Sequence, residues 1–214
     1  MLSKIKDKKG SAGPLVMGIF LILLLVTQFV GDFKKNNFEN VYKKCSWGME
    51  TGTKTALTRA VKKDIEIGFL EDTNKYNQYF KLNHAEAIKT FFECYYSSIG
   101  VDSSTKILEN ATTIAIVEPD TAEYKVTIYK NGSIILNNSY TDIKEIERSI
   151  NARLANTTIK LFNNDQRSIV NLENKTYLIA VTEDLKLTDY EEFINISYFE
   201  GSNLNRNINM RGDK

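Results

Sequence analysis

The segment KDKKGSAGPLVMGIFLILLLVTQFVGDFKKNN, residues 6–37, decides where this chain is located and how its fold begins. Its central part, residues 12–30, carries no charge. As a helix it would span roughly 28 Å, close to the hydrocarbon thickness of a bilayer. Apolar residues lie on every side of that helix, which suits lipid better than a one-sided protein core. We therefore expect a transmembrane helix over residues 11–31.

The charges before this helix predict its orientation. The first nine residues contain four lysines and one aspartate, a net charge of +3. Because basic flanks stay on the cytoplasmic side, residues 1–10 are expected to form a cytoplasmic leader and the C-terminal domain to be extracytoplasmic. The sequence thus predicts a single-pass protein of the cell membrane whose first partner is the lipid bilayer.

A cleaved secretory signal and a buried core helix are the two alternatives to a retained span. Signal cleavage needs small residues one and three positions before the cut, and a cut after Gly31 would place Phe29 at the third position. A core helix of a soluble protein rarely contains so long an uncharged run. Both alternatives are therefore weaker than a retained transmembrane helix.

The residues that follow the apolar run predict a helical spine over residues 32–70. Apolar and small residues recur there at steps of three or four, the spacing of one helix face. These residues are Phe38, Val41, Cys45, Met49, Gly52, Ala56 and Ala60. Gly48 and Gly52 are each about 1 kcal/mol less favourable in a helix than alanine, so these glycines are the points at which the spine could bend.

The rest of the chain predicts a small α+β head with antiparallel strands over residues 71–202, followed by a polar tail at 203–214. A helix is expected between Asn83 as its N-cap and Gly100 as its stop. Its expected buried face consists of Ala85, Ile88, Phe92, Tyr95 and Ile99. Strands are expected at 112–119, 175–182 and 192–201, with a further helix at 142–156. A hairpin over 122–140 is expected to turn at Asn131-Gly132.

Cys45 and Cys94 form a candidate disulfide, since each lies on a predicted helix. In an extracytoplasmic domain the bond is chemically allowed. Closing a loop of about 50 residues would stabilise the fold by about 4 kcal/mol in the chain-entropy model. The alternative is two free thiols that pack as small hydrophobic side chains.

The sequence predicts no catalytic residue, metal or cofactor, which disfavours an enzyme; an envelope enzyme whose site the sequence does not reveal is the third alternative function. His84 and Glu86 match the H-x-E of zinc deaminases, but the required P-C-x-x-C is missing. Motifs for nucleotide binding and nucleophilic catalysis are also missing. The acidic pairs, Glu183 with Asp184 and Glu191 with Glu192, are expected to be solvated loop charges. After residue 10 the net charge is −2, which disfavours nucleic-acid binding.

Residues 8–26, KKGSAGPLVMGIFLILLLV, resemble the N-terminus of type IV pilin-like proteins, especially the TadE-like minor pilins of tight-adherence systems. In that family a short basic leader ends in glycine and a prepilin peptidase cuts after it. The resemblance implies that Lys9 and Gly10 end the leader and that Ser11 is the first mature residue. The family usually places a glutamate five residues after the cut, where it pairs with a neighbour's amino terminus. This chain has Leu15 there.

The resemblance implies a membrane-anchored, pilin-like structural subunit of a bacterial surface appendage or secretion apparatus. Its expected partners are other pilin-like subunits, assembly-platform proteins and a prepilin peptidase. The alternative is a single-pass, signal-anchored extracytoplasmic module that binds or senses a partner and has no enzymatic activity. This second function uses the same helix but needs no cleavage.

Overall fold

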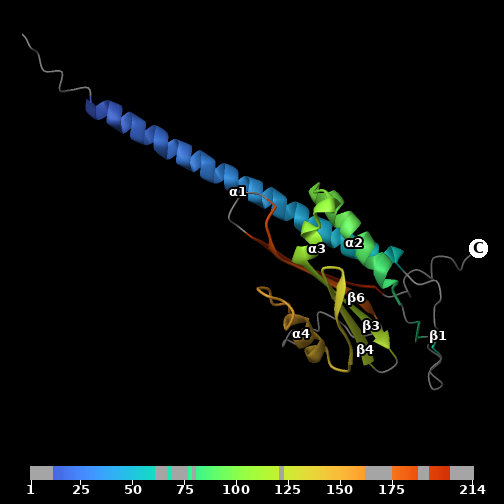
Figure 1. Ribbon diagram of the computed structural model, residues 1–214. Coiled ribbons are helices and arrows are strands. Elements are labelled where there is room, and N and C mark those ends of the chain that lie inside the picture. The colour runs from blue at the N-terminus through green and yellow to red at the C-terminus, as the bar shows by residue number, and fades with distance from the viewer. Residues whose placement is uncertain are drawn as a thin grey trace, which may run out of the picture. The chain divides into compact units, whose positions relative to one another are not determined.

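A computed structural model describes residues 12–60, 67–68, 77–78, 81–120, 123–161, 175–187 and 193–202, and it has the predicted α+β architecture (Figure 1). The helices are α1 (Ala12–Arg59), α2 (His84–Ile99), the 3₁₀ turn η1 (Ser103–Thr105), α3 (Ile107–Ala111) and α4 (Ile143–Asn151). The strands are β1 (Ile67–Gly68), β2 (Asn77–Gln78), β3 (Thr112–Asp120), β4 (Glu123–Lys130), β5 (Ser133–Tyr140), β6 (Thr176–Leu185) and β7 (Ile194–Ser202). The predicted leader and polar tail lie outside the described residues.

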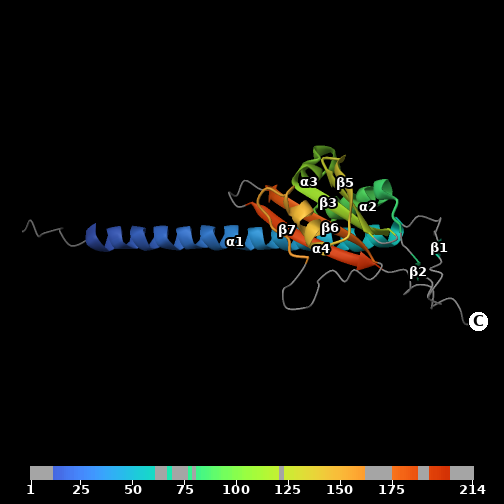
Figure 2. The same ribbon diagram turned by 90° about the horizontal axis from the view of Figure 1, so that it is seen from below.

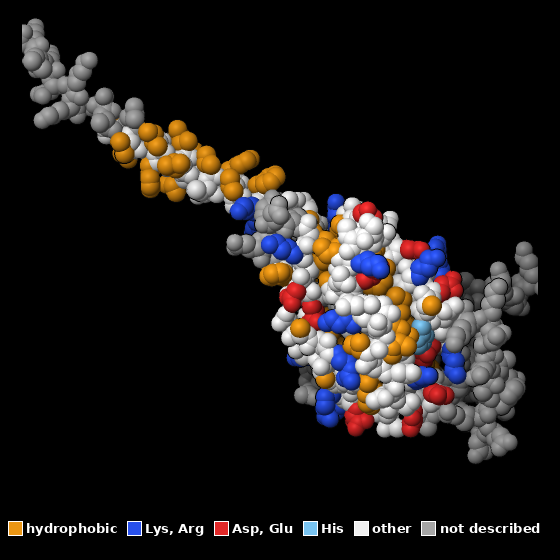
Figure 3. All heavy atoms as spheres, viewed as in Figure 1, with side chains coloured by type: hydrophobic (Ala, Val, Ile, Leu, Met, Phe, Trp, Pro, Cys, Tyr) orange, Lys and Arg blue, Asp and Glu red, His pale blue; other side chains and the backbone are white. Residues whose placement is uncertain are grey.

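The chain forms two compact units, Met1–Val41 and Tyr42–Lys214, and α1 contributes to both. From Val16 to Phe33, the large apolar side chains are exposed, from 44% for Leu24 to 72% for Phe29, whereas Phe38 and Val41 are half-buried. Figure 3 shows orange side chains along this part of the helix. Within the described part of the chain, α1 is the one helix long and apolar enough to cross a membrane. Its first part is therefore compatible with a single membrane span.

In the second unit, α1 is one-sided. Cys45, Met49 and Ala56 are completely buried, whereas Lys54 is exposed and pairs with Glu50 at 2.6 Å. This part of α1 confirms the predicted apolar stripe. The helix ends at Arg59, earlier than the predicted limit of the spine at residue 70. Within that predicted spine, β1 pairs instead with β2 as a short antiparallel ladder.

Gly48 and Gly52 of α1 lie close to α2. A Cβ added at Gly52 would lie 2.9 Å from the carbonyl oxygen of Phe91. One added at Gly48 would lie 2.9 Å from the Cβ of Ser98 and from Cδ2 of Tyr95. The helix continues through both positions. These glycines therefore permit helix packing, and the helix is not interrupted at either of them.

The helix α2 begins and ends where predicted, but its buried face is rotated about the helix axis relative to the predicted face. The Asn83 side chain accepts a hydrogen bond from the backbone N–H of Glu86, and Gly100 ends the helix at φ +79°. The residues that are completely buried are Ala87, Phe91 and Tyr95. Of the predicted stripe, Ala85 is exposed and Ile88 and Ile99 are only half-buried, so that prediction was wrong for these three residues. The reason is that α2 contacts α1 through the line that contains Phe91 and Tyr95.

Five antiparallel strands form the sheet of the head in the order β5-β4-β3-β6-β7. The strands β3, β4, β6 and β7 lie where strands were predicted, and β5 is the second strand of the predicted hairpin. Asn131 and Gly132 both have positive φ, 52° and 70°, as a two-residue type I′ turn requires. Asp142 caps α4 by accepting from the N–H of Lys144, and the helix ends at Asn151 instead of the predicted residue 156. The short elements η1 and α3 were not predicted.

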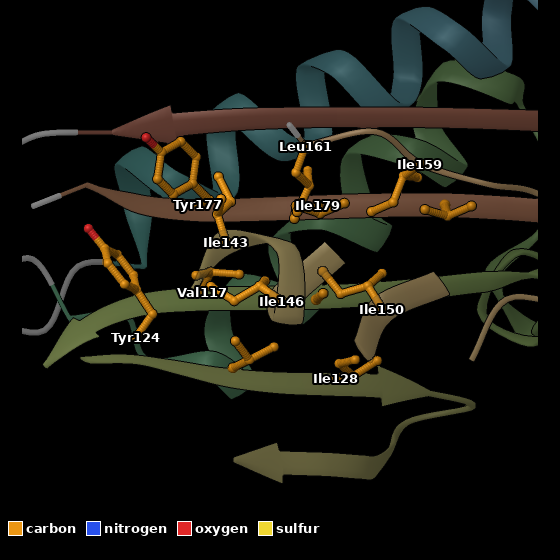
Figure 4. Close-up of a cluster of buried hydrophobic side chains, with 13 residues drawn as sticks. Val117, Tyr124, Ile128, Ile143, Ile146, Ile150, Ile159, Leu161, Tyr177 and Ile179 are labelled. Atoms are coloured by element: carbon orange, nitrogen blue, oxygen red, sulfur yellow. The ribbon is translucent and has the colours of Figure 1, made fainter. Parts of the chain in front are cut away.

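Helices cover both faces of this sheet. In the turned view of Figure 2, α4 lies over the strands, and Figure 4 shows its isoleucines inserted among side chains from β3, β4 and β6. This cluster consists of Ala115, Val117, Tyr124, Val126, Ile128, Ile143, Ile146, Ile150, Ile159, Leu161, Tyr177, Ile179 and Val181. The opposite face packs against α1 and α2 with buried apolar side chains such as Ile114 and Ile116, and a group of hydrogen-bonded hydroxyls lies among them. There Thr182 Oγ1 lies 2.9 Å from Thr112 Oγ1 and 3.2 Å from the Tyr95 hydroxyl, and donates to Met49 Sδ at 3.4 Å.

The close contact at Gly52 predicts a large effect for a single methyl group. We expect Gly52→Ala to destabilise the head by about 1–3 kcal/mol, because the Phe91 carbonyl is backbone and cannot rotate away. Gly31→Ala is the matched control, since it makes the same change in the same helix with nothing within 4 Å. Denaturant unfolding of the full chain in detergent, followed by circular dichroism, measures the difference. Equal stability of the two variants would contradict this packing.

Candidate functional site

A groove of about 690 Å³ lies beside the N-terminal end of α2, on the face of the sheet that α1 and α2 leave uncovered over β4 and β5. The chain's single histidine, pale blue in Figure 3, is visible on this side of the molecule. Charged, polar and apolar side chains share the lining. They are Lys81, Leu82, Asn83, His84, Ala85, Ile88, Glu118, Pro119, Asp120, Lys125, Thr127, Tyr129, Gly132, Ile134 and Asn137.

The imidazole of His84 is held between two side chains from the sheet. Its Nε2 lies 2.9 Å from Oε2 of Glu118 and its Nδ1 lies 2.7 Å from the hydroxyl of Tyr129. The other carboxylate oxygen of Glu118 accepts a hydrogen bond of 2.7 Å from the backbone N–H of Leu82. The side chains of His84 and Glu118 are only 22% and 10% exposed. The three side chains therefore form one hydrogen-bonded chain at the wall of the groove.

Chemistry decides the direction of these hydrogen bonds. A carboxylate only accepts, so Nε2 of His84 must carry the proton that it donates to Glu118. In a neutral imidazole Nδ1 is then the acceptor, and it receives the O–H of Tyr129. Burial raises the pKa of Tyr129, and the nearby charge of Glu118 raises it further. The phenol thus stays protonated at neutral pH and remains a donor.

The carboxylate of Glu118 and the hydroxyl of Tyr129 together hold the imidazole of His84 in one orientation at the wall of the groove. The described residues that line the groove include no serine or cysteine, but two other hydroxyl groups, those of Thr127 and Tyr129, lie there. Within the described part of the chain, no group of three His, Cys, Asp or Glu side chains is placed to hold a metal ion.

The acidic pair Glu183 and Asp184 holds the segment after α4. The carboxylate of Glu183 accepts backbone N–H groups of Ala155, Asn156 and Thr157 at 2.7–3.0 Å. Burial acts to raise the pKa of Glu183, but these three donors outweigh it and the pKa is lowered. Asp184 accepts from the side-chain amide of Asn156 at 2.5 Å. Glu183 is therefore a buried structural carboxylate, so the prediction of a solvated charge was wrong for it, whereas Asp184 is exposed as predicted. Glu191 and Glu192 lie outside the described residues.

The candidate disulfide is not formed in this structure, where Cys45 and Cys94 are free thiols. Cys45 is completely buried against Tyr95, while Cys94 is half-buried. Burial raises the pKa of the Cys45 thiol to about 11, partly offset by its hydrogen bond with Tyr95. Because the thiolate is the reactive species, Cys45 is a poor nucleophile at neutral pH. The candidate cleavage residues Lys9, Gly10 and Ser11 lie outside the described residues.

Sequence reasoning placed His84 correctly in the first turn of a helix beside its cap, but it did not find the partners of the imidazole. Glu118 and Tyr129 lie 34 and 45 residues further along the chain, on two different strands. No short motif links them. The only local signal was that Glu118 follows the apolar run of β3, while Tyr129 lies in the alternating strand β4 and gave no signal.

No family model matches this chain, and no match was found among curated proteins or solved structures.

The direction of the His84 hydrogen bonds can be inverted by one substitution. In Glu118→Gln the amide oxygen still accepts from Leu82, while the NH₂ group must donate to Nε2 of His84. The imidazole proton should therefore move to Nδ1 and donate to the Tyr129 hydroxyl. Histidine ¹⁵N NMR spectra of the full chain in detergent at pH 8 report the tautomer. Tyr129→Phe is the control and should keep the Nε2–H form; the same tautomer in wild type and Glu118→Gln would contradict this geometry.

The lowered pKa of Glu183 predicts acid-sensitive stability. A carboxylate whose pKa is lower in the folded state than in the unfolded chain stabilises the fold at pH values above its unfolded-state pKa, near 4.5. That contribution is lost as the pH falls through the folded-state pKa. Glu183→Gln should therefore cost about 1.5–3 kcal/mol at pH 7, with a difference that shrinks below about pH 4. Denaturant unfolding curves at pH 7 and below about pH 4 measure this difference in stability. Glu123→Gln, at an exposed site on β4, is the control, and a pH-independent difference for Glu183→Gln would contradict the assignment.

Proposed function

We propose that this chain is a membrane-anchored, pilin-like structural subunit of a bacterial surface appendage or secretion apparatus. The observation that supports it most strongly is the continuity of α1. One helix carries the exposed apolar segment and, from Tyr42 onward, a buried face of the α+β head. A subunit of this kind needs such a helix, because its apolar part serves in lipid or against other apolar helices while the head remains folded in water.

The packing of the head supports a structural role for α1. Met49 and Cys45 are completely buried, and Gly48 and Gly52 lie at backbone distance from α2. The anchor is therefore attached through an element of the core rather than through a loose connection.

The proposed topology follows from the basic leader, which has a net charge of +3. Residues 1–10 are cytoplasmic, the first part of α1 crosses the cell membrane once, and the head is extracytoplasmic. The proposed partners are the bilayer, other pilin-like subunits, assembly-platform proteins and a prepilin peptidase. Leu15 in place of the usual glutamate means that subunit contacts must be made without the charge pair at the amino terminus.

A second candidate is a signal-anchored extracytoplasmic module that binds or senses a partner. The groove favours it, because His84, Glu118 and Tyr129 offer an ordered hydrogen-bonding wall beside apolar side chains. Neither candidate is an enzyme. The two differ in processing, since only the pilin-like subunit requires removal of the leader.

Cleavage after Gly10 tests the proposed function. N-terminal sequencing of protein extracted from membranes should find Ser11 as the first residue. Gly10→Ala should leave the leader in place, because in the pilin-like family that this segment resembles the peptidase cuts after the glycine that ends the leader. Gly13→Ala is a matched control that should still be cleaved. A wild-type chain that begins before Gly10 in a host with a prepilin peptidase would remove the pilin-like function and favour the anchored binding module.

A further inference from the structure

The outer edge of β5 is unusually open for a strand at the end of a sheet. β5 pairs with β4 on one side, and among the described residues no strand pairs with its other side. Six of its eight residues are exposed, and only Leu136 and Tyr140 are half-buried. An unpaired edge offers a row of backbone N–H and C=O groups that only another extended chain can satisfy together.

The composition of β5 does not protect this edge. Its sequence, SIILNNSY, has no charged residue and no proline, whereas each of the other four strands of the sheet carries at least one charged residue. Proteins usually block exposed edges with lysine, proline or inward-pointing charges. An uncharged edge has one further property: it can pair with a copy of itself, because no like charges are brought face to face.

A bulge limits where a second strand can pair. The β4–β5 register shifts between Ile128, which pairs with Leu136, and Tyr129, which pairs with Ile134. Ile135 is therefore an additional residue, and the regular part of the edge is the five residues 136–140. In an antiparallel pair, residues that lie opposite each other have their side chains on the same face of the sheet. When the two strands are identical copies, the twofold axis that relates them therefore has to pass through a residue of this segment.

Only an axis at Asn138 uses all five residues. It places Leu136 opposite Tyr140 of the second copy, an apolar–aromatic pair on the face that α4 covers. It places Asn137 opposite Ser139 on the other face, and Asn138 opposite itself. Each pair is of a kind that stabilises neighbouring strands: one apolar contact and two sets of polar groups that can donate to one another.

We propose that β5 is a homotypic interface, through which two copies of this chain join their sheets by antiparallel pairing of residues 136–140 about Asn138. The interface depends on the fold of the head and not on the proposed function, so it can fail while the cleavage prediction holds. The partner is a second copy because the uncharged, self-complementary five-residue segment matches its own sequence in this register.

Disulfide trapping tests the register. Opposed residues in an antiparallel pair have Cα atoms about 4.5–5.5 Å apart, within the range for a disulfide. Full-length Asn138→Cys in detergent should therefore form a covalent dimer on mild oxidation. Ser197→Cys is the matched control, because it places a cysteine at an exposed position of β7, the strand at the other edge of the sheet. Equal cross-linking of the two variants, or none at position 138, would overturn the proposal.

A charge on the axis tests the interface itself. Asn138→Lys brings two ammonium groups together and should raise the dissociation constant of the dimer by about fivefold, as measured by sedimentation of the full chain in detergent. Ser197→Lys adds the same charge at the other edge strand and should leave the dimer unchanged. Circular dichroism confirms that each variant is folded. A monomeric wild type would overturn the proposal. A dimer whose dissociation constant changes with neither lysine substitution, or with Ser197→Lys alone, would overturn it as well.

Discussion

The contact between the backbones of α1 and α2 is the constraint on which the head depends. Gly48 and Gly52 present no side chain toward α2, so Phe91 and Tyr95 lie directly over them. This proximity brings both helices onto one face of the sheet, where Tyr95 and Met49 contact the hydroxyl of Thr182. The part of the sheet left uncovered over β4 and β5 follows from where these two helices lie.

The two faces of the sheet differ in the contacts that bind the helices to them. On the α4 face the contacts are almost entirely aliphatic, from Ile146 and Ile150 to the strands (Figure 4). Such packing tolerates substitutions that conserve volume. The face toward α1 and α2 also buries apolar side chains, such as Ile116 and Leu178, and adds hydroxyl groups that are buried and hydrogen-bonded across elements. A buried hydroxyl that loses its partner costs free energy, so this face specifies the register of helices on strands more strictly.

The head also leaves two surfaces open, and they differ in what they can recognise. The groove beside α2 offers fixed side-chain donors and acceptors through His84, Glu118 and Tyr129. The edge of β5 offers backbone groups and no charge. A subunit that is anchored at one end and must contact neighbours or partners through its head has use for both kinds of surface, because backbone pairing orients a partner and side chains select it.

Local signals allowed much of this protein to be predicted from its sequence. The apolar run of α1, the caps Asn83 and Gly100, and the Asn131-Gly132 turn each depend on residues close together in the chain, where one helix or one turn determines the outcome. The buried face of α2, the contact at Gly52 and the His84–Glu118–Tyr129 chain were decided only by the tertiary structure. Each joins residues at least 34 positions apart, and no local pattern specifies which distant surface a helix face will meet.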